Sequence, residues 1–522
     1  MSPDILLPYS QSWCSVSFLP AVFLALISLG AFATLISTRN RKKDGVPTLP
    51  ETIPCLSSAL LYMTDMQSFL SKTKATFRST NVLAFNIGPQ KVYMITGARN
   101  VANIFRTTAN VGQEIFILKI QKYLYGSVPS DYAKFLNDKS GRAKVPAPGT
   151  ENTPTTKRYW YSMNNLLHGY LARAHDTNVL AAVYQREFNK ALEVFPTTEW
   201  SETLVYTTVL QNLVWGLPKW MNRKAWKARD RLHAATAKYL YPTVDNFDWD
   251  SSSATADWEP VFGSRANREV IRWMREDGFA AQTIAGAVST LFIFGSNGNT
   301  TPTVAWMLME IVKRPELLQQ VRDEVLTAYV THPHTGERSI DAQMLLALPL
   351  LQSVYIEGLR LHVSLNVTRE VVGPLTLEGY ELEKGAILQA PTDISHREES
   401  VWGAPDHPAS EFWAERHIKY VKTVDEKGGS VKMERQFSMA GRQNHFFPYG
   451  GGAPICPGRF FAKQEMMLTV ATLVSRFDIE FAGWTYMDGS PSDSPAENDG
   501  RWAGSATVPP DRDMRIRWKR LW

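Results

Sequence analysis

Apolar side chains recur at helical spacing in three long segments of the chain. From Asn164 to Phe195 they fall three or four residues apart, which predicts a helix with one interruption. Gln282 to Val312 is the longest apolar segment after the N-terminal one. Leu350 to Leu361 reads as a further helix, with Pro349 placed as a first-turn residue whose missing N–H would be unpaired there anyway. We expect all three segments to be helical.

Shorter segments carry strand and turn signals. Val82 to Tyr93 reads as a short strand pair that turns at Gly88-Pro89-Gln90. The stretch from Leu375 to Leu388 is hairpin-like, because apolar residues there alternate with two glycine-containing turn signals. Two polar stretches are predicted to be loops: 139–157 and 245–257.

The N-terminal apolar run predicts a membrane anchor. No residue from Val16 to Ser37 is charged, and as a helix this run is about 33 Å long, enough to cross a bilayer core. A basic cluster, Arg39 to Lys43, follows it and places the rest of the chain in the cytoplasm by the positive-inside rule. A cleaved signal peptide is disfavoured, because its basic cluster precedes the apolar run. We expect an anchor at 1–38, a basic, proline-rich linker at 39–54 and a catalytic domain at 55–522.

Composition excludes several classes of protein. The chain has 522 residues, of which 44% are hydrophobic and 20% charged, so it can bury a sizeable core and is not disordered. A net charge of +5 is small for this length and gives no case for nucleic-acid binding. Only three cysteines occur, Cys14, Cys55 and Cys456, which rules out a disulfide framework.

One cysteine stands in a distinctive loop. Three glycines, Gly450 to Gly452, lead to Cys456, and helical spacing resumes after Pro457 and Gly458. Cys456 at or beside a helix N-cap would meet free backbone N–H groups that stabilise a thiolate, and a thiolate suits a soft metal. A buried cysteine that is only a small apolar residue is the simpler alternative. A phosphate loop is disfavoured, since no Gly-Lys-Ser/Thr ends the stretch.

The stretch HFFPYGGGAPICPGRFF resembles the haem-binding loop of the cytochrome P450 superfamily. The resemblance implies haem b as cofactor, Cys456 as the iron ligand, and cofactor contacts from Tyr449, Gly450, Gly452 and Gly458. Pro454 stands where the family usually has a basic residue. That position varies in the subgroup with prostacyclin synthase and the sterol 7α- and 12α-hydroxylases, so the departure points to that subgroup.

The middle of the long apolar segment turns small and polar between Gly295 and Thr301, followed by Pro302. This is either a loop between two helices or one helix that is locally opened, because a proline removes the hydrogen bond to the carbonyl of residue 298. By resemblance, Gly298 and Asn299 replace an acid and a threonine that deliver protons. Asn299 and Thr300 are therefore the catalytic candidates. An amide orients oxygen or water but is no acid near neutral pH, so protons must come through water, Thr300 or the substrate.

Glu357 and Arg360 are three residues apart and can pair on one helix face, which alone is most often a solvated surface pair. The resemblance implies instead a buried brace near the cysteine loop, made by Glu357, Arg360 and Arg416. It also implies that Arg369 binds a haem propionate. The family's Trp-x-x-x-Arg motif would fall on Trp160 and Asn164; its arginine is missing, so neither residue is assigned a role.

Taken together, the resemblance implies a mainly α fold with a small β lobe, the haem-thiolate fold of cytochromes P450. The expected function is a monooxygenase that oxidises a lipophilic steroid, terpenoid or related secondary metabolite with electrons from NADPH through a reductase. The expected location is the endoplasmic reticulum membrane, single-pass, with the catalytic domain in the cytoplasm. Two alternatives stay open: an isomerase or dehydratase acting on a pre-oxidised substrate without a reductase, and a non-catalytic haem-binding protein.

Overall fold

The structure is a computed structural model that describes residues 45–53, 56–77, 80–107, 109–195, 197, 199–205, 223–334, 336–424 and 431–522. The predicted anchor helix, Cys14 and Cys55 lie outside these residues. Within the described ranges, none of the helices combines the length and the apolar character that a bilayer crossing requires.

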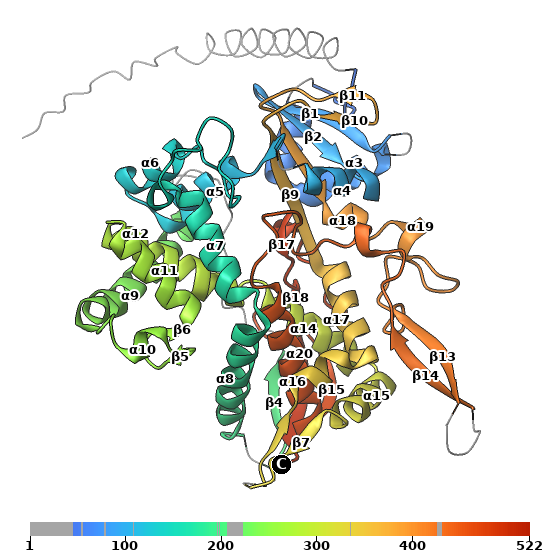
Figure 1. Cartoon of the computed structure of the whole chain (residues 1–522). Coiled ribbons are helices and arrows are strands. Elements are labelled where there is room, and N and C mark those ends of the chain that lie inside the picture. The colour runs from blue at the N-terminus through green and yellow to red at the C-terminus, as the bar shows by residue number, and fades with distance from the viewer. Residues whose placement is uncertain are drawn as a thin grey trace, which may run out of the picture.

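Helices account for about half of the described chain, and Figure 1 shows them gathered below and beside a small β lobe. The first half contains α2 (Ser57–Thr64), α3 (Met66–Thr76), α4 (Ala98–Arg106), α5 (Glu114–Ile120), α6 (Pro129–Asn137), α7 (Tyr159–Leu171), α8 (Ala174–Leu192), α9 (Arg223–Asn246), α10 (Ser252–Thr255) and α11 (Arg265–Glu276). The second half contains α12 (Ala281–Val288), α13 (Gly295–Asn297), α14 (Thr300–Val312), α15 (Pro315–Leu326), α16 (Ala342–Ala347), α17 (Pro349–His362), α18 (Thr392–Ser395), α19 (Glu399–Trp402) and α20 (Arg459–Arg476).

Within the described ranges, the strands form two larger sheets and four two-stranded ones. A six-stranded sheet has the order β1-β2-β12-β9-β17, with β3 paired to β9: β1 (Val82–Ile87), β2 (Gln90–Ile95), β3 (Val111–Gly112), β9 (Val363–Val371), β12 (Ile387–Pro391) and β17 (Ser505–Thr507). A four-stranded sheet has the order β16-β15-β18-β4: β4 (Ser201–Leu204), β15 (Phe477–Tyr486), β16 (Pro491–Ser492) and β18 (Arg512–Arg520). The two-stranded sheets are β5 (Trp258–Glu259) with β6 (Gly263–Ser264), β7 (Tyr329–Thr331) with β8 (Arg338–Ile340), β10 (Thr376–Leu377) with β11 (Tyr380–Glu381), and β13 (Ile418–Val424) with β14 (Val431–Phe437).

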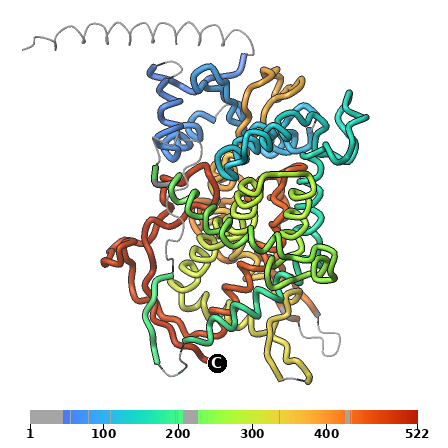
Figure 2. Tube along the Cα trace, turned by 90° about the vertical axis from the view of Figure 1, so that its left-hand side faces the viewer, coloured from blue at the N-terminus to red at the C-terminus, as the bar shows by residue number. Residues whose placement is uncertain are grey.

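The main hydrophobic core lies between α14, α15, α17 and α20, which are packed against one another. A second core joins α7, α9, α11 and α12. Figure 2 shows the N-terminal strands and helices (blue) at one end of the molecule, away from the C-terminus. The packed helices of the main core fix the positions of the loops that connect them.

The elements predicted from periodicity are confirmed. The segment from Asn164 is two helices, α7 and α8, interrupted at Ala172 and Arg173. The strand pair β1–β2 turns at Gly88 and Pro89, and β10, β11 and β12 form the predicted hairpin region. The stretch 245–257, predicted as a loop, includes the end of α9 and the short helix α10, so that prediction was wrong in part.

Candidate active site

The cysteine loop, residues 446–458, joins a short helical turn (Gln443–His445) to α20 and folds back on itself. The Cys456 backbone N–H donates to the Tyr449 carbonyl (3.0 Å), and the Ile455 N–H donates to the Gly452 carbonyl (3.1 Å). Gly450 and Gly452 both have φ of 74°, a backbone conformation that favours glycine. The loop is therefore a closed turn that holds Cys456 at a defined position.

Two of the loop's glycines lie against Phe105 of α4. A Cβ on Gly451 would stand 2.2 Å from the Phe105 ring, and one on Gly452 would stand 2.5 Å from the Phe105 carbonyl oxygen. Neither position can carry a side chain without moving α4 or the loop. The glycines are thus required by close packing as well as by backbone conformation.

Cys456 lies inside the molecule and yet has an accessible surface. Burial raises the pKa of its thiol, whereas backbone N–H groups of Gly458 and Arg459 and the Arg459 side chain lower it. The thiol is therefore accessible to a ligand although protein surrounds much of it. The helix α20 begins at Arg459 with Gly458 as N-cap, so Cys456 lies two residues before the N-cap. The backbone N–H groups that favour the thiolate, those of Gly458 and Arg459, belong to the start of α20, as expected.

The Tyr449 side chain anchors the loop to α17. Its hydroxyl is 2.7 Å from the Tyr355 hydroxyl, and burial raises the pKa of both phenols. The backbone carbonyl of Tyr449 also receives the Cys456 N–H. Tyr449 therefore connects the cysteine to the main core through both its side chain and its backbone.

The predicted brace is assembled and fully buried. Arg360 donates to the two Glu357 oxygens at 2.6 and 2.9 Å, and Arg416 Nε donates to Oε2 at 3.0 Å. The side chains of Glu357, Arg360 and Arg416 in these ion pairs have no solvent-exposed surface. The alternative of a solvated surface pair is thereby excluded. The arginines also donate to backbone carbonyls, Arg360 to that of His396 and Arg416 to those of Pro408 and Glu411.

His417 completes the brace and was missed in the sequence. Its Nε2 is 3.1 Å from Glu357 Oε1. Burial by itself would raise the pKa of Glu357, but hydrogen bonds and charge from Arg360 and His417 hold it well below its usual range. The one available signal was that His417 directly follows Arg416.

The brace is connected to the cysteine loop through His396. Arg360 donates to the His396 carbonyl at 3.0 Å, and His396 Nε2 accepts the Phe447 backbone N–H at 3.1 Å. Phe447 in turn accepts the Gly450 N–H at 3.0 Å through its carbonyl. A displacement of Arg360 would thus be passed directly to the loop that carries Cys456.

Arg369 of β9 reaches the same loop from the β lobe. It donates to the Gly451 carbonyl and to the Thr368 carbonyl, each at 2.8 Å, and is only 8% exposed. Burial and the positive charge of Arg142 lower the pKa of Arg369 to about 10. Among the described residues, Arg369 forms no ion pair. A buried guanidinium in this position calls for an anionic partner.

These residues fit a haem. Cys456 offers a single soft thiolate that a ligand can reach, and Arg369 offers a carboxylate-binding fork next to the same loop. No group of three or more His, Cys, Asp or Glu side chains that could hold a metal occurs in the part of the chain that the structure describes. One cysteine without further protein ligands matches the axial ligation of a haem iron.

The long apolar segment is a helix that is locally opened, and the alternative of a loop between two helices was wrong. It runs as α12, a π-helical segment (Ser289–Phe294), α13 and α14, with the break at Gly298 and Asn299. Both residues at the break keep right-handed helical backbone angles. Pro302, which has no N–H for the Gly298 carbonyl, stands four residues on, and this explains where the helix opens.

The two catalytic candidates differ in their surroundings. The Asn299 side-chain carbonyl accepts the Thr507 backbone N–H at 3.2 Å, and Asn299 is exposed. The Thr300 side chain is buried and donates to the Ser296 carbonyl at 2.6 Å. Its single hydroxyl proton is therefore in use, which leaves the Thr300 oxygen as an acceptor.

Glu465 of α20 approaches Thr300 and was also missed. Burial raises the pKa of Glu465 to about 7, against a smaller lowering by the Thr300 hydroxyl. One of its carboxyl oxygens, Oε2, is buried without a hydrogen-bond partner. No local pattern marks this residue, because the contact joins α14 and α20, which are far apart in the sequence.

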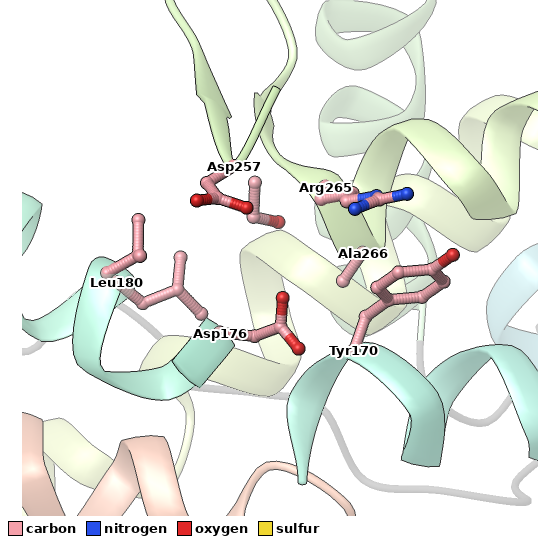
Figure 3. A pocket seen from close by; sticks show the side chains of 8 residues that line it. Tyr170, Asp176, Leu180, Asp257, Arg265 and Ala266 are labelled. Carbon is pink, nitrogen blue, oxygen red and sulfur yellow. The ribbon is translucent and has the colours of Figure 1, made fainter. Parts of the chain in front are cut away.

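Two pockets lie away from the cysteine loop and the brace. Figure 3 shows one between α7, α8 and α11, with Tyr170, Asp176, Asp257 and Arg265 around it. None of its lining residues belongs to the cysteine loop, the brace or the opened helix. A second, mostly apolar pocket lies in the second core and is lined by Phe135, Met163 and Ala287 among others. We assign neither a role in the chemistry of Cys456.

Comparison with known proteins supports the same identification. The family model described as "Cytochrome P450" matches residues 183–488. "Cytochrome P450 monooxygenase calL" of Penicillium decumbens is 41% identical over 90% of this chain and 92% of its own. "Cytochrome P450 monooxygenase efuG" of Hormonema carpetanum is 25% identical over 93% and 92%. The "5-beta-cholestane-3-alpha,7-alpha-diol 12-alpha-hydroxylase" of Sus scrofa is 30% identical over 48% of each chain.

The chain therefore belongs to the cytochrome P450 family. It is a haem-thiolate oxidoreductase of the monooxygenase type with the mainly helical fold expected. The resemblance to a sterol 12α-hydroxylase fits the subgroup indicated by Pro454 and Asn299.

Proposed function

We propose that this protein is a membrane-anchored monooxygenase that inserts oxygen into a lipophilic secondary metabolite of steroid, terpenoid or related type. The observation that carries the proposal is the similarity to a cytochrome P450 monooxygenase along nine tenths of the chain, with Cys456 inside the segment that matches the family model. When bound, the haem supplies the activation of dioxygen. The protein's own residues hold it, shape the space around it and move protons.

We propose the following roles for the site. Cys456 is the proximal thiolate ligand, and Glu357, Arg360 and Arg416 hold its loop in place through His396 and Phe447. Arg369 binds a carboxylate of the haem, which would satisfy its buried charge. Four further residues are assigned to cofactor contact or to loop geometry: Tyr449, Gly450, Gly452 and Gly458.

Asn299 would orient dioxygen or water with its amide, and Thr300 would relay protons. Since an amide is not an acid near neutral pH, the proton must be held elsewhere. Glu465, which is within reach of the Thr300 hydroxyl, is the buried carboxyl that can hold it near neutral pH. Glu465 Oε2 has no hydrogen-bond partner, and the Thr300 hydroxyl oxygen can still accept a hydrogen bond. Both observations are consistent with a protonated Glu465.

Membrane anchoring and electron supply are part of the proposal. The uncharged run from Val16 to Ser37, followed by basic residues, supports a single-pass anchor at 1–38 with a linker at 39–54 and the catalytic domain at 55–522 in the cytoplasm, at the endoplasmic reticulum. An anchor suits substrates that partition into the bilayer. NADPH electrons would arrive through a reductase partner.

The first test is a reduced, carbon monoxide difference spectrum of the membrane fraction, for wild type and Cys456→Ala. We expect a red-shifted, thiolate-type Soret band in the wild type and its loss in the variant, since alanine offers no ligand. Circular dichroism of both proteins controls for folding. A folded wild type without such a band would contradict the haem-thiolate assignment.

An isomerase or dehydratase acting on a pre-oxidised substrate is the second candidate. Gly298 and Asn299 favour it, because a reaction without dioxygen needs no acid at those positions. Turnover that requires NADPH and a reductase would exclude it, and turnover of a peroxide substrate without NADPH would support it. Either kind of turnover would exclude a non-catalytic haem-binding protein.

A further inference from the structure

The second cation expected beside the haem carboxylates is missing from α7. Trp160 occupies the tryptophan position of the expected Trp-x-x-x-Arg motif, but Asn164 carries no charge. The Trp160 indole Nε1 donates to the Phe135 carbonyl at 3.0 Å inside the second core, so it has no donor left for a ligand. Without a second arginine, Arg369 is the one residue proposed so far to bind the haem carboxylates.

A different arginine lies on the face of the same tryptophan. The Arg142 guanidinium carbon is 5.0 Å from the centre of the Trp160 ring. Arg142 comes from the loop between α6 and α7, which was predicted to lie at the surface, and yet its side chain is only 15% exposed. The loop thus turns one of its basic residues inward.

Hydrogen bonds hold the loop in this conformation. Arg158, itself 4% exposed, donates to the Ser140 hydroxyl (3.2 Å) and to the Lys144 carbonyl (2.9 Å), on either side of Arg142. Asp138 accepts from the Ser140 backbone N–H at 2.8 Å and from the Trp160 backbone N–H at 3.0 Å. These bonds tie the loop to the start of α7, so the inward position of Arg142 is built into the fold.

Arg142 and Arg369 form a buried excess of positive charge. Glu114, which pairs with Arg142, lies two residues after Gly112 of β3, and Gly112 pairs with Glu370, the neighbour of Arg369 on β9. Burial lowers the pKa of each guanidinium, and the charge of Arg142 lowers that of Arg369 further. Among the residues that the structure describes, the carboxylate paired with either arginine is that of Glu114, whose Oε1 is 3.5 Å from Arg142 Nε. The Gln113 side-chain carbonyl, in the orientation that satisfies both groups, accepts from Arg142 at 2.6 Å. One partly exposed carboxylate does not balance two buried guanidiniums.

We propose that Arg142 and Arg369 together form the binding site for the haem carboxylates, with Arg142 taking the place of the arginine absent at position 164. This inference rests on the proposed function, because it presumes a haem on Cys456. A planar guanidinium can bind a carboxylate with two parallel hydrogen bonds, which is the reason for an arginine here. Of the five N–H groups of Arg142, the contacts with Glu114 and Gln113 use at most three, so the others are available as donors. The loop of residues 138–158 thereby becomes part of the cofactor site.

The test compares the rates at which haem passes from the purified protein to excess apomyoglobin. Arg142→Gln is expected to release haem at least about 10-fold faster than wild type, since a charge-assisted contact is worth roughly 1.5–3 kcal/mol and 1.4 kcal/mol is tenfold. Lys144→Gln is the matched control, because it removes a positive charge from an exposed position of the same loop. Equal release by wild type and Arg142→Gln would overturn the proposal.

A second measurement separates carboxylate binding from a structural role. The apoproteins are reconstituted with haem and with haem dimethyl ester, whose carboxylates are blocked, and release is measured for both. With the ester, wild type and Arg142→Gln are expected to release the porphyrin at the same rate. The same difference with both porphyrins would mean that Arg142 acts on the fold alone. If Arg142→Gln fails to fold, Arg142→Lys replaces it in this comparison.

The two hypotheses fail separately. A wild type without a thiolate-type carbon monoxide band would contradict the haem-thiolate function itself. A normal band in the wild type, with release rates unaffected by Arg142→Gln, would contradict only the role of Arg142.

Discussion

Glu465 is a residue whose environment, rather than its type, determines its protonation. A carboxyl near a surface would be charged at neutral pH, but burial between α14 and α20 disfavours the charged form and raises the pKa of Glu465 from 4.5 to about 7. Because the native protein holds this proton more tightly than the unfolded chain does, the protonated group favours the native state below pH 4.5. This contribution is lost as pH rises from 4.5 to about 7.

We therefore expect Glu465→Gln to remove a pH dependence. Between pH 5 and 7.5 the free energy of unfolding of the wild type should fall relative to that of the variant, by on the order of 1–3 kcal/mol. Denaturant unfolding at several pH values measures this. If the free energy of unfolding changes with pH in the same way for both proteins, the Glu465 carboxyl is not protonated in the folded state. Infrared spectroscopy offers a direct check, as a protonated carboxyl band that the variant lacks.

At the scale of one element, the cysteine loop depends on glycines for two separate reasons. Gly450 and Gly452 share a φ of 74°, but a Cβ on Gly450 would meet nothing within 4 Å, whereas one on Gly452 would meet the Phe105 carbonyl at 2.5 Å. Their alanine variants therefore separate backbone strain from steric clash.

Gly450→Ala should destabilise the apoprotein by about 1–2 kcal/mol, the cost of a left-handed backbone conformation. Gly452→Ala should cost clearly more, because Phe105 or the loop must also move. Thermal unfolding of the two apoproteins gives the comparison, and haem content shows whether the loop still binds the cofactor. Equal losses of stability would mean that α4 shifts freely and that the contact with Phe105 does not constrain the loop.

At the scale of the whole molecule, one end of the chain is proposed to hold the protein at a membrane while the described body carries the chemistry. The six-stranded sheet, the main core and the cysteine loop all form from residues after 45. The contacts described for the candidate site join residues between 105 and 507.

Deleting residues 1–38 is accordingly expected to release most of the protein from the membrane fraction and to leave the carbon monoxide difference spectrum unchanged. Fractionation followed by spectroscopy of each fraction tests both parts. Replacing the basic residues 39–43 by glutamine, with the apolar run intact, is the control for charge alone. A shortened protein that stays entirely with the membrane would show that the anchor lies elsewhere in the chain.

Local patterns in the sequence were sufficient for what depends on neighbours along the chain. The helix predicted from Leu350 to Leu361 is α17, and the strand pair near Gly88 is β1–β2, because periodicity and turn residues act over a few positions. The single cysteine after three glycines, with Glu357, Arg360 and Arg416 in order, was enough to indicate the family. Residue types and their order are properties that a chain carries before it folds.

The tertiary structure alone decided what depends on segments far apart in sequence. It buried the Glu357 brace, which by local criteria is most often a solvated pair, and added His417 to it. It turned Arg142 inward from a polar loop and brought Glu465 of α20 to Thr300. Burial and pairing set the charge of these side chains, and both arise only when distant elements pack together. For that reason the sequence determined the class of chemistry, and the fold decided which charged groups surround it.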